Sequence, residues 1–194
     1  MSRTILKIQI MKKQIKTLAL ILAGMAASTL VNAQTVMVGG EAMYPQKNIV
    51  ENAIKSNDHT TLVAAVKAAG LVDALMSDGP MTVFAPVNSA FDALPEGTVA
   101  TLLKPENKTM LTSILTYHVL AGRIDAKELM KLIKKGNGTA TLKALSGATL
   151  TFKMNGGNNI QVIDEKGAAA NISVYDVYQS NGVIHSIDKV LLPS

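Results

Sequence analysis

The chain has 194 residues with no Cys and no Trp, and its 19 Lys and Arg against 14 Asp and Glu give a formal charge of +5. The lack of Cys excludes disulfides, a thiolate nucleophile, a cysteine-bound metal and the lipidated Cys of a bacterial lipoprotein. Five of the basic residues and none of the acidic ones lie in the first 33 positions, so residues 34–194 are formally neutral and their net charge predicts neither nucleic acid nor an anionic membrane as a partner.

Residues 1–33 have the pattern of an export signal. Three lysines between positions 12 and 16 precede an apolar stretch over 18–30, and Val31-Asn32-Ala33 has the small-x-small form of a cleavage site. The apolar stretch is shorter than the roughly 20 residues that a membrane span needs. We therefore expect a signal peptide over 1–33, with Met11 as an alternative start, and no integral membrane anchor after cleavage. The protein is then exported, to the periplasm or to the extracellular space.

The remaining chain divides into an arm and one domain. Residues 34–47 have no steady hydrophobic period, and we interpret them as an extended N-terminal arm. Residues 48–194 contain no internal repeat or low-complexity linker and are numerous enough to bury a core, which predicts a single domain.

The first part of this domain has helical spacing. Apolar residues recur at three and four positions over 49–54, and a second helix is predicted from Asp58, a natural N-cap, to Gly70. Further short helices are expected over 71–76, 97–103 and 107–116.

Residues 81–95 predict a buried strand that leads directly into a helix. Thr82, Val83 and Phe84 are β-branched or aromatic, and Pro86 is expected to end their ladder. Asn88 is a good N-cap for a short helix that buries Phe91 and that Pro95 ends.

The second part changes from helix to strands. A strand-like segment over 117–120 precedes a helix that Asp125 and Glu128 open as a capping box and that Gly136 closes. After Gly138 the period becomes two and turn pairs recur, which predicts a series of antiparallel strands. The run 183–192 is apolar on both faces, so we expect it in the middle of the sheet.

Three separated motifs in this order resemble those of the fasciclin (FAS1) domain family, in its single-domain exported bacterial form. The first is the segment 82–91, the second is the Tyr117-His118 pair, and the third is the segment 181–193. The residues that carry the resemblance, and that we expect to be structural, are Thr82, Val83, Phe84, Ala85, Pro86, Asn88, Phe91, Tyr117, His118, Asn181, Gly182, His185 and Asp188.

The resemblance implies an α+β fold, a fasciclin-like β-sandwich or wedge whose mostly helical N-terminal half packs on an antiparallel sheet. It also implies a role in extracellular adhesion, with a surface or matrix protein or polysaccharide as partner. In animal members an Asp-Ile pair at the place of Asp176-Val177 is associated with integrin binding. We interpret Asp176-Val177 as a loop leading into the last strand, with an adhesion loop as the alternative.

The sequence offers no catalytic constellation. His59, His118 and His185 form no His-Glu-x-x-His pair and accompany no Gly-x-Ser-x-Gly turn, so we expect buried, hydrogen-bonded histidines and neither an enzyme, a metal site nor a cofactor. An alternative function is the carriage of an apolar small ligand such as a carotenoid or a lipid, because some fasciclin-domain proteins bind carotenoids and the chain is rich in Ala, Val, Leu and Met.

Overall fold

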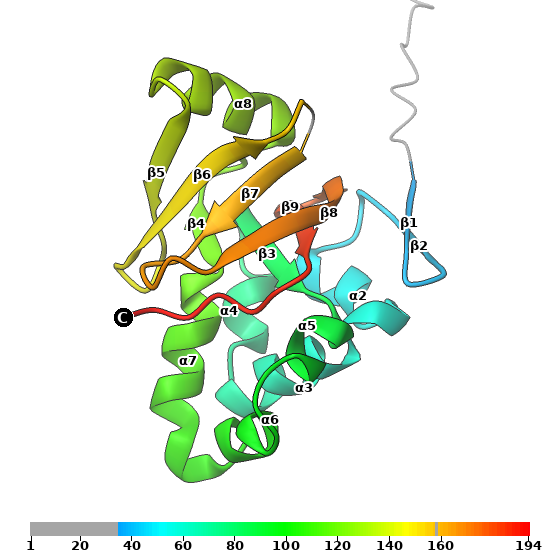
Figure 1. The fold of residues 1–194 in the computed structure, drawn as a ribbon. Coiled ribbons are helices and arrows are strands. Elements are labelled where there is room, and N and C mark those ends of the chain that lie inside the picture. The colour runs from blue at the N-terminus through cyan, green and yellow to red at the C-terminus, as the bar shows by residue number, and fades with distance from the viewer. Residues whose placement is uncertain (1–34, 158) are drawn as a thin grey trace, which may run out of the picture. The chain divides into compact units, whose positions relative to one another are not determined.

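Two β-sheets and several short helices make up the part of the chain that the computed structural model describes, residues 35–157 and 159–194 (Figure 1). The expected signal peptide, residues 1–33, lies outside the described residues. The helices are α2 (Ile49–Ala53), α3 (Thr60–Ala69), α4 (Val72–Met76), α5 (Asn88–Asp92), α6 (Thr98–Leu102), α7 (Lys108–Tyr117) and α8 (Ala126–Lys135), with 3-10 turns η1 (Asn57–His59) and η2 (Pro105–Asn107). The strands are β1 (Val36–Val38), β2 (Glu41–Met43), β3 (Met81–Pro86), β4 (Val119–Ala121), β5 (Thr139–Lys143), β6 (Thr149–Asn155), β7 (Asn159–Ile163), β8 (Ala169–Gln179) and β9 (Gly182–Ile187).

The larger sheet has the strand order β4-β3-β9-β8-β7-β6-β5. All neighbours pair antiparallel except β3 and β9, which run parallel with Phe84 opposite His185. The last strand of the chain therefore lies between β3 and β8, as its two apolar faces predicted, although it ends at Ile187 rather than at 192. The predicted α+β class is confirmed.

Strand β3 is buried along its whole length because both of its faces are covered. Met81, Val83 and Ala85 face one apolar cluster together with side chains of α2, α3 and α7. Phe84 faces a second cluster together with α8 and the strands β6 to β8. Alternate side chains of β3 therefore belong to two cores, one beneath the helices and one inside the strand series.

The strand series from β5 to β9 is built from hairpins at the predicted turn pairs. Gly147, Gly156 and Gly167 have positive φ angles of 93°, 70° and 84° in the turns that follow β5, β6 and β7. At the far edge, Ala144, directly after β5, forms a bridge with Leu120 in β4. The two edge strands of the sheet thus come together at this corner.

Of three local predictions, the structure corrects two, on the arm and on Asp58, and confirms one, on Pro86. The N-terminal arm contains a β-hairpin, β1 and β2, whose turn at Gly39 and Gly40 has φ angles of 61° and 79°, as a tight hairpin turn requires. Pro86 is the last residue of β3, paired with Ile187, so the prediction that it ends the ladder is confirmed. Asp58 lies in η1 and does not cap α3, whose N-cap position is His59.

Two further predictions on helix ends differ. Ile54 was expected on the buried face of its helix but is 49% exposed, and Asn52 takes the buried position instead. The Asn52 side chain accepts from the Tyr44 N–H at 3.0 Å and donates to the Tyr44 carbonyl at 2.8 Å, which attaches the hairpin to α2. Asp125 caps α8 by accepting from the Glu128 N–H at 2.8 Å, as predicted, whereas the Glu128 carboxylate bonds Lys131 at 3.0 Å.

Candidate functional site

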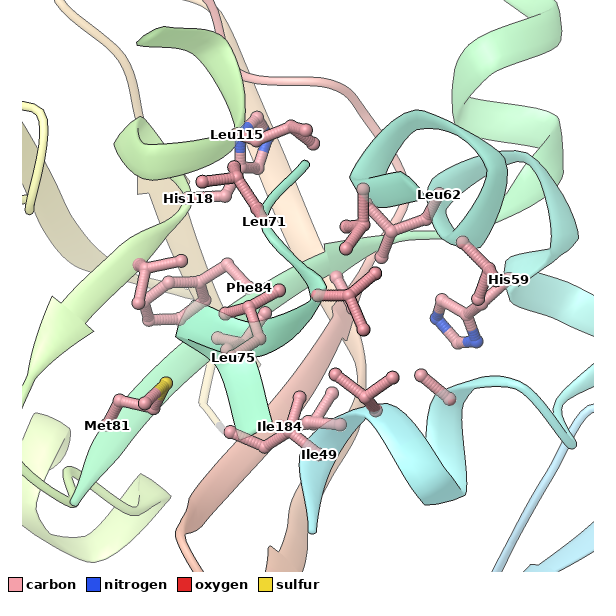
Figure 2. A pocket seen from close by; sticks show the side chains of 18 of the residues that line it. Ile49, His59, Leu62, Leu71, Leu75, Met81, Phe84, Leu115, His118 and Ile184 are labelled. Carbon is pink, nitrogen blue, oxygen red and sulfur yellow. The ribbon is translucent and has the colours of Figure 1, made fainter. Parts of the chain in front are cut away.

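An apolar cavity of about 220 Å³ lies between the helices and the face of the sheet formed by β3 and β9. Figure 2 shows side chains of α2, α3, α4, β3, α7 and β9 surrounding it, with Leu115 and His118 on one side and Ile49 and Ile184 on the opposite side. Apolar side chains make up most of the lining, namely Val38, Met43, Ile49, Val50, Leu62, Val63, Val66, Leu71, Val72, Leu75, Met81, Val83, Phe84, Leu115, Val119, Leu145, Val177 and Ile184.

The cavity exists because α4 covers the sheet loosely. None of the residues of α4 is buried, and Leu71, Val72 and Leu75 are only half-buried while they face the cavity. The helix is five residues long and follows Gly70, whose left-handed conformation (φ 72°) ends α3. A short helix with few buried side chains cannot fill the space above β3, and the cavity remains.

Two asparagines of the family motifs hold the helices that wall the cavity. Asn181 accepts from the Ile49 N–H, at the first turn of α2, at 3.0 Å, and it donates to the carbonyls of Leu75 and Ser77, at the end of α4, at 2.9 Å each. Asn181 thereby satisfies backbone groups at helix ends that have no partner within the helix.

Asn88 does the same for α3. Its side-chain oxygen accepts from the Thr61 N–H at 3.1 Å, and its amide donates to the Asn57 carbonyl at 2.8 Å. The prediction that Asn88 caps its own helix is wrong, since Val87 is the N-cap position of α5 and makes no side-chain cap. Asn88 instead caps α3, a helix that lacks a local cap.

Gly182 is required by close packing rather than by the turn. The two turn residues between β8 and β9 are Ser180 and Asn181, and a methyl group built on Gly182 would lie 2.1 Å from the Met81 carbonyl oxygen. Only glycine allows β3 to approach β9 at this point.

Phe84 is the residue at which the three motifs meet. Its ring stacks on His185 at a centroid distance of 5.5 Å, and its N–H donates to the His118 carbonyl at 2.9 Å. The neighbouring Thr82 hydroxyl donates to the Gly122 carbonyl at 2.7 Å and accepts from the Ile124 N–H at 2.9 Å, which fixes the connection between β4 and α8. Val83 and Ala85 are buried on the cavity side, and Phe91 is half-buried at the edge of the same core.

Tyr117 and His118 end α7 and are buried. The Tyr117 hydroxyl donates to the Thr149 carbonyl at 2.7 Å and accepts from the Glu165 N–H at 3.0 Å, and burial raises the pKa of Tyr117 to about 12. His118 Nδ1 lies 2.8 Å from the Ile114 carbonyl, which can only accept, so Nδ1 carries the proton and Nε2 accepts from the Leu191 N–H at 3.0 Å. Burial lowers the pKa of His118 to about 4.

His185 is held in the opposite tautomer. Its Nε2 lies 3.0 Å from the Ile124 carbonyl and donates to it, so Nδ1 accepts from the Asp176 N–H at 3.3 Å. Burial lowers the pKa of His185, and the Asp176 carboxylate, 3.9 Å from Nδ1, opposes that shift only in part.

His59 completes the set of buried histidines. Its two ring nitrogens lie 2.8 Å from the Ser56 hydroxyl and 3.3 Å from the Ser186 hydroxyl, and burial lowers its pKa. His59 and His118 both line the cavity, yet each of their ring nitrogens already has a hydrogen-bond partner in the protein. Histidine therefore supplies the cavity with no free donor or acceptor.

Asp176-Val177 is not a loop. Both residues lie inside β8, at a β-bulge where the pairing with β9 shifts, and Asp176 has a φ of 56°. The bulge turns the Asp176 carboxylate toward the start of α8, where it accepts from the Ala126 N–H at 2.8 Å, while Val177 is buried against the cavity. The last motif residue, Asp188, accepts from the backbone and side-chain amides of Asn171 at 2.7 and 2.8 Å and fixes the start of β8.

Within residues 35–157 and 159–194, no three His, Cys, Asp or Glu side chains are grouped to hold a metal ion. None of the helices in the same ranges is long and apolar enough to cross a membrane.

Lys67 is a lining residue that the sequence reasoning missed. Lys67 lies in the last turn of α3, where a lysine is commonly solvated and favoured by the negative end of the helix dipole, so the sequence gives no sign of a cavity beside it. The cavity that it borders depends on how α3, α4 and β3 pack, and no local pattern reveals that packing.

Comparison with known proteins agrees with the motifs and the fold. A family model for the fasciclin domain matches residues 57–193. The chain is 46% identical over 160 residues to the protein sll1483 of Synechocystis sp., which covers 82% of this chain and 81% of that protein. It is 35% identical over 153 residues to the immunogenic protein MPB70 of Mycobacterium bovis, over 76% of this chain and 70% of that protein. Among solved structures, a FAS1 domain pair from the insect cell adhesion molecule Fasciclin I has a TM-score of 0.68 at 19% identity, over 76% of this chain and 51% of that chain.

Proposed function

The chain belongs to the fasciclin family, and from this premise we propose that it is an exported, non-enzymatic module that binds a protein or a polysaccharide of the cell surface or the extracellular matrix. One observation carries the proposal. Nearly all of the family-motif side chains are buried or bonded to backbone groups, as Asn181, His185 and Asp188 are. Recognition of a partner then falls to the exposed surface that this scaffold supports.

The N-terminal hairpin and α2 offer the best surface for this role. Large apolar side chains are exposed there at Met37 (60%), Tyr44 (46%) and Ile54 (49%), and exposed aromatic and apolar residues are the usual anchors of protein interfaces. The bond network of Asn52 holds the hairpin against α2, so the three side chains stand on a rigid support.

The test is deletion of the gene in its native host, followed by measurement of surface attachment, biofilm mass and aggregation. We expect all three to fall and to be restored by the wild-type gene. A variant with Met37, Tyr44 and Ile54 changed to Ser should not restore them, whereas the matched exposed pair Met110→Ser and Met130→Ser should. A deletion strain with unaltered attachment, biofilm and aggregation would contradict the proposal.

A second candidate function is the carriage of an apolar small ligand, which the cavity of about 220 Å³ favours because apolar side chains dominate its lining. Protein purified from its native host should then carry a lipid or a pigment that mass spectrometry detects after extraction. Absence of any such molecule from freshly purified protein would count against carriage and would leave the adhesion proposal standing.

We also propose that residues 1–33 are removed during export, which leaves an arm over 34–47 and a fasciclin domain over 48–194. The exported protein should then begin at Gln34 in N-terminal sequencing of the periplasmic and medium fractions. The fraction that holds it distinguishes a periplasmic location from an extracellular one, and a first residue other than Gln34 would show that the cleavage site is wrong.

A further inference from the structure

We propose that the cavity binds the hydrocarbon chain of a medium-length aliphatic monocarboxylate, with the carboxylate at the mouth beside Lys67 and Lys108. This inference rests on the second candidate function, the carriage of an apolar ligand, and narrows it to one chemical class. Three observations support it: the size of the cavity, the chemistry of its interior and the charge at its edge.

The size of the cavity limits the length of the chain. An apolar protein cavity of about 150 Å³ accommodates benzene, which corresponds to roughly 25 Å³ for each non-hydrogen atom. A cavity of about 220 Å³ then holds about nine such atoms. With the carboxyl carbon left outside, this is the hydrocarbon chain of a carboxylate of about ten carbons. A carotenoid is several times longer, so the cavity cannot enclose one without a rearrangement of the surrounding helices.

The interior accepts hydrocarbon and rejects polar groups. Every buried side-chain nitrogen and oxygen in residues 35–157 and 159–194 already has a hydrogen-bond partner. His59 and His118 have both ring nitrogens engaged, so a polar group placed beside them would lose its water without gaining a bond. The enclosed part of the ligand is therefore aliphatic.

The edge of the cavity carries positive charge. Lys67, in the last turn of α3, lines the cavity and is exposed. Lys108, at the start of α7, lies against the end of the same helix, since a methyl group built on Gly70 would be 3.2 Å from its Nζ. Helix α3 contains no acidic residue, and neither lysine takes part in an ion pair within the described ranges. Lys67 thus borders the cavity, and the Lys108 ammonium group lies beside Gly70, the residue just before α4 begins to cover the cavity.

This arrangement fits a ligand with one charged end. The chain would enter beneath α4, whose half-buried residues Leu71 and Leu75 can move apart without breaking a tightly packed core. The carboxylate stays in water at the mouth, where pairing with exposed lysines adds a modest and salt-sensitive contribution to binding.

Titration calorimetry of the purified protein with decanoate, decan-1-ol and acetate tests the proposal. We expect decanoate to bind, decan-1-ol to bind about fivefold more weakly because it lacks the charge, and acetate not to bind because it lacks the chain. The Lys67→Gln/Lys108→Gln variant should bind decanoate only as well as the alcohol and should keep the affinity for decan-1-ol. The Lys143→Gln/Lys153→Gln variant removes the same charge from exposed strand positions and should behave like the wild type.

The outcomes separate the two proposals. Equal affinities of the wild type for decanoate and decan-1-ol, or an unchanged affinity of Lys67→Gln/Lys108→Gln for decanoate, would overturn the role of the lysines and leave carriage of an apolar ligand intact. Failure of both long-chain compounds to bind would overturn both. Val66→Phe fills the cavity from α3 and should abolish decanoate binding. If it binds decanoate normally while its circular dichroism and unfolding midpoint match the wild type, the chain does not lie in the cavity.

Discussion

Replacement of Asn181 by Ala tests whether one side chain holds the wall of the cavity. Asn181 is 8% exposed and joins the turn between β8 and β9 to the start of α2 and to the end of α4. The substitution removes one acceptor and two donors without introducing a larger group. It leaves the Ile49 N–H and the carbonyls of Leu75 and Ser77 without their partner.

The expected loss of stability follows from these three bonds. Each contributes about 1 kcal/mol net, so the variant should lose about 3 kcal/mol, roughly a hundredfold in the unfolding equilibrium. For a domain of this size the free energy of unfolding falls by about 2 kcal/mol for each molar of urea. The urea concentration at the unfolding midpoint should therefore fall by about 1.5 M. Asn181→Asp keeps the acceptor for Ile49 but places a carboxylate against two carbonyls, so it should not rescue stability.

Urea unfolding followed by circular dichroism measures the global effect, and amide hydrogen exchange locates it. Exchange should accelerate first in α2 and α4, because these helices lose their attachment. Asn155→Ala is a matched control, since Asn155 is exposed and bonds only through an exposed contact to Asn171. If Asn181→Ala shifts the midpoint no more than Asn155→Ala does, Asn181 does not hold these helices.

The remaining predictions concern the core, the cap of α3 and acid. Phe84→Ala should destabilise by about 3–5 kcal/mol because its ring is fully buried and lies 5.3 Å from that of Phe152, whereas the half-buried Phe91→Ala should cost about half as much; equal urea midpoints for the two would contradict this packing. Asn88→Ala should cost about 1–2 kcal/mol and expose the Thr61 amide to exchange. Asn88→Asp keeps the acceptor for Thr61 but places a carboxylate oxygen against the Asn57 carbonyl, so it should recover only part of the loss; no increase in Thr61 exchange in Asn88→Ala would contradict the cap. Burial lowers the pKa of His118 from 6.5 to about 4. Between pH 6.5 and pH 4 the unfolded chain therefore binds a proton that the folded chain does not, and the free energy of unfolding falls as the pH drops. His118 alone should contribute about 2 kcal/mol of loss between pH 7 and pH 5, and His118→Asn should flatten the profile of urea midpoints against pH over that range; an unchanged slope would show that His118 is not the group responsible.

The elements of this fold could be predicted where the information was local. The alternation of Leu150, Phe152 and Met154, the turn pairs and the apolar run of the last strand predicted the strand series and the central place of β9. Side-chain period and turn residues are properties of neighbouring positions, so one sequence carries them.

The bonds made at long range could not be predicted. Asn88 is a residue type that commonly caps its own helix. It caps α3 instead, because α5 begins beside the N-terminus of α3. Asp176 precedes Asn181-Gly182 and resembles a loop residue, yet a bulge keeps it inside β8 and turns it toward α8. In both cases the short-range pattern is ambiguous and the tertiary arrangement decides which backbone group the side chain meets.

The cavity is another feature that depends on tertiary packing and could not be predicted from the sequence. Several of its lining residues are ordinary core residues, since Met81, Val83 and Ile184 are buried. The sequence does not show that α4 leaves space above the sheet unfilled. That space depends on how a five-residue helix lies over two strands.

The position of β9 has a consequence for the order in which the molecule can fold. The strand at the middle of the sheet is almost the last segment of the chain, and it pairs in parallel with β3, about a hundred positions earlier. Closing so long a loop is slow, and β3 has no partner on that side until residues 182–187 are available. The core around β3 can therefore be completed only after the C-terminal segment has been synthesised. Loss of the last dozen residues should leave β3 and β8 as open edges and give an aggregation-prone chain rather than a smaller folded domain.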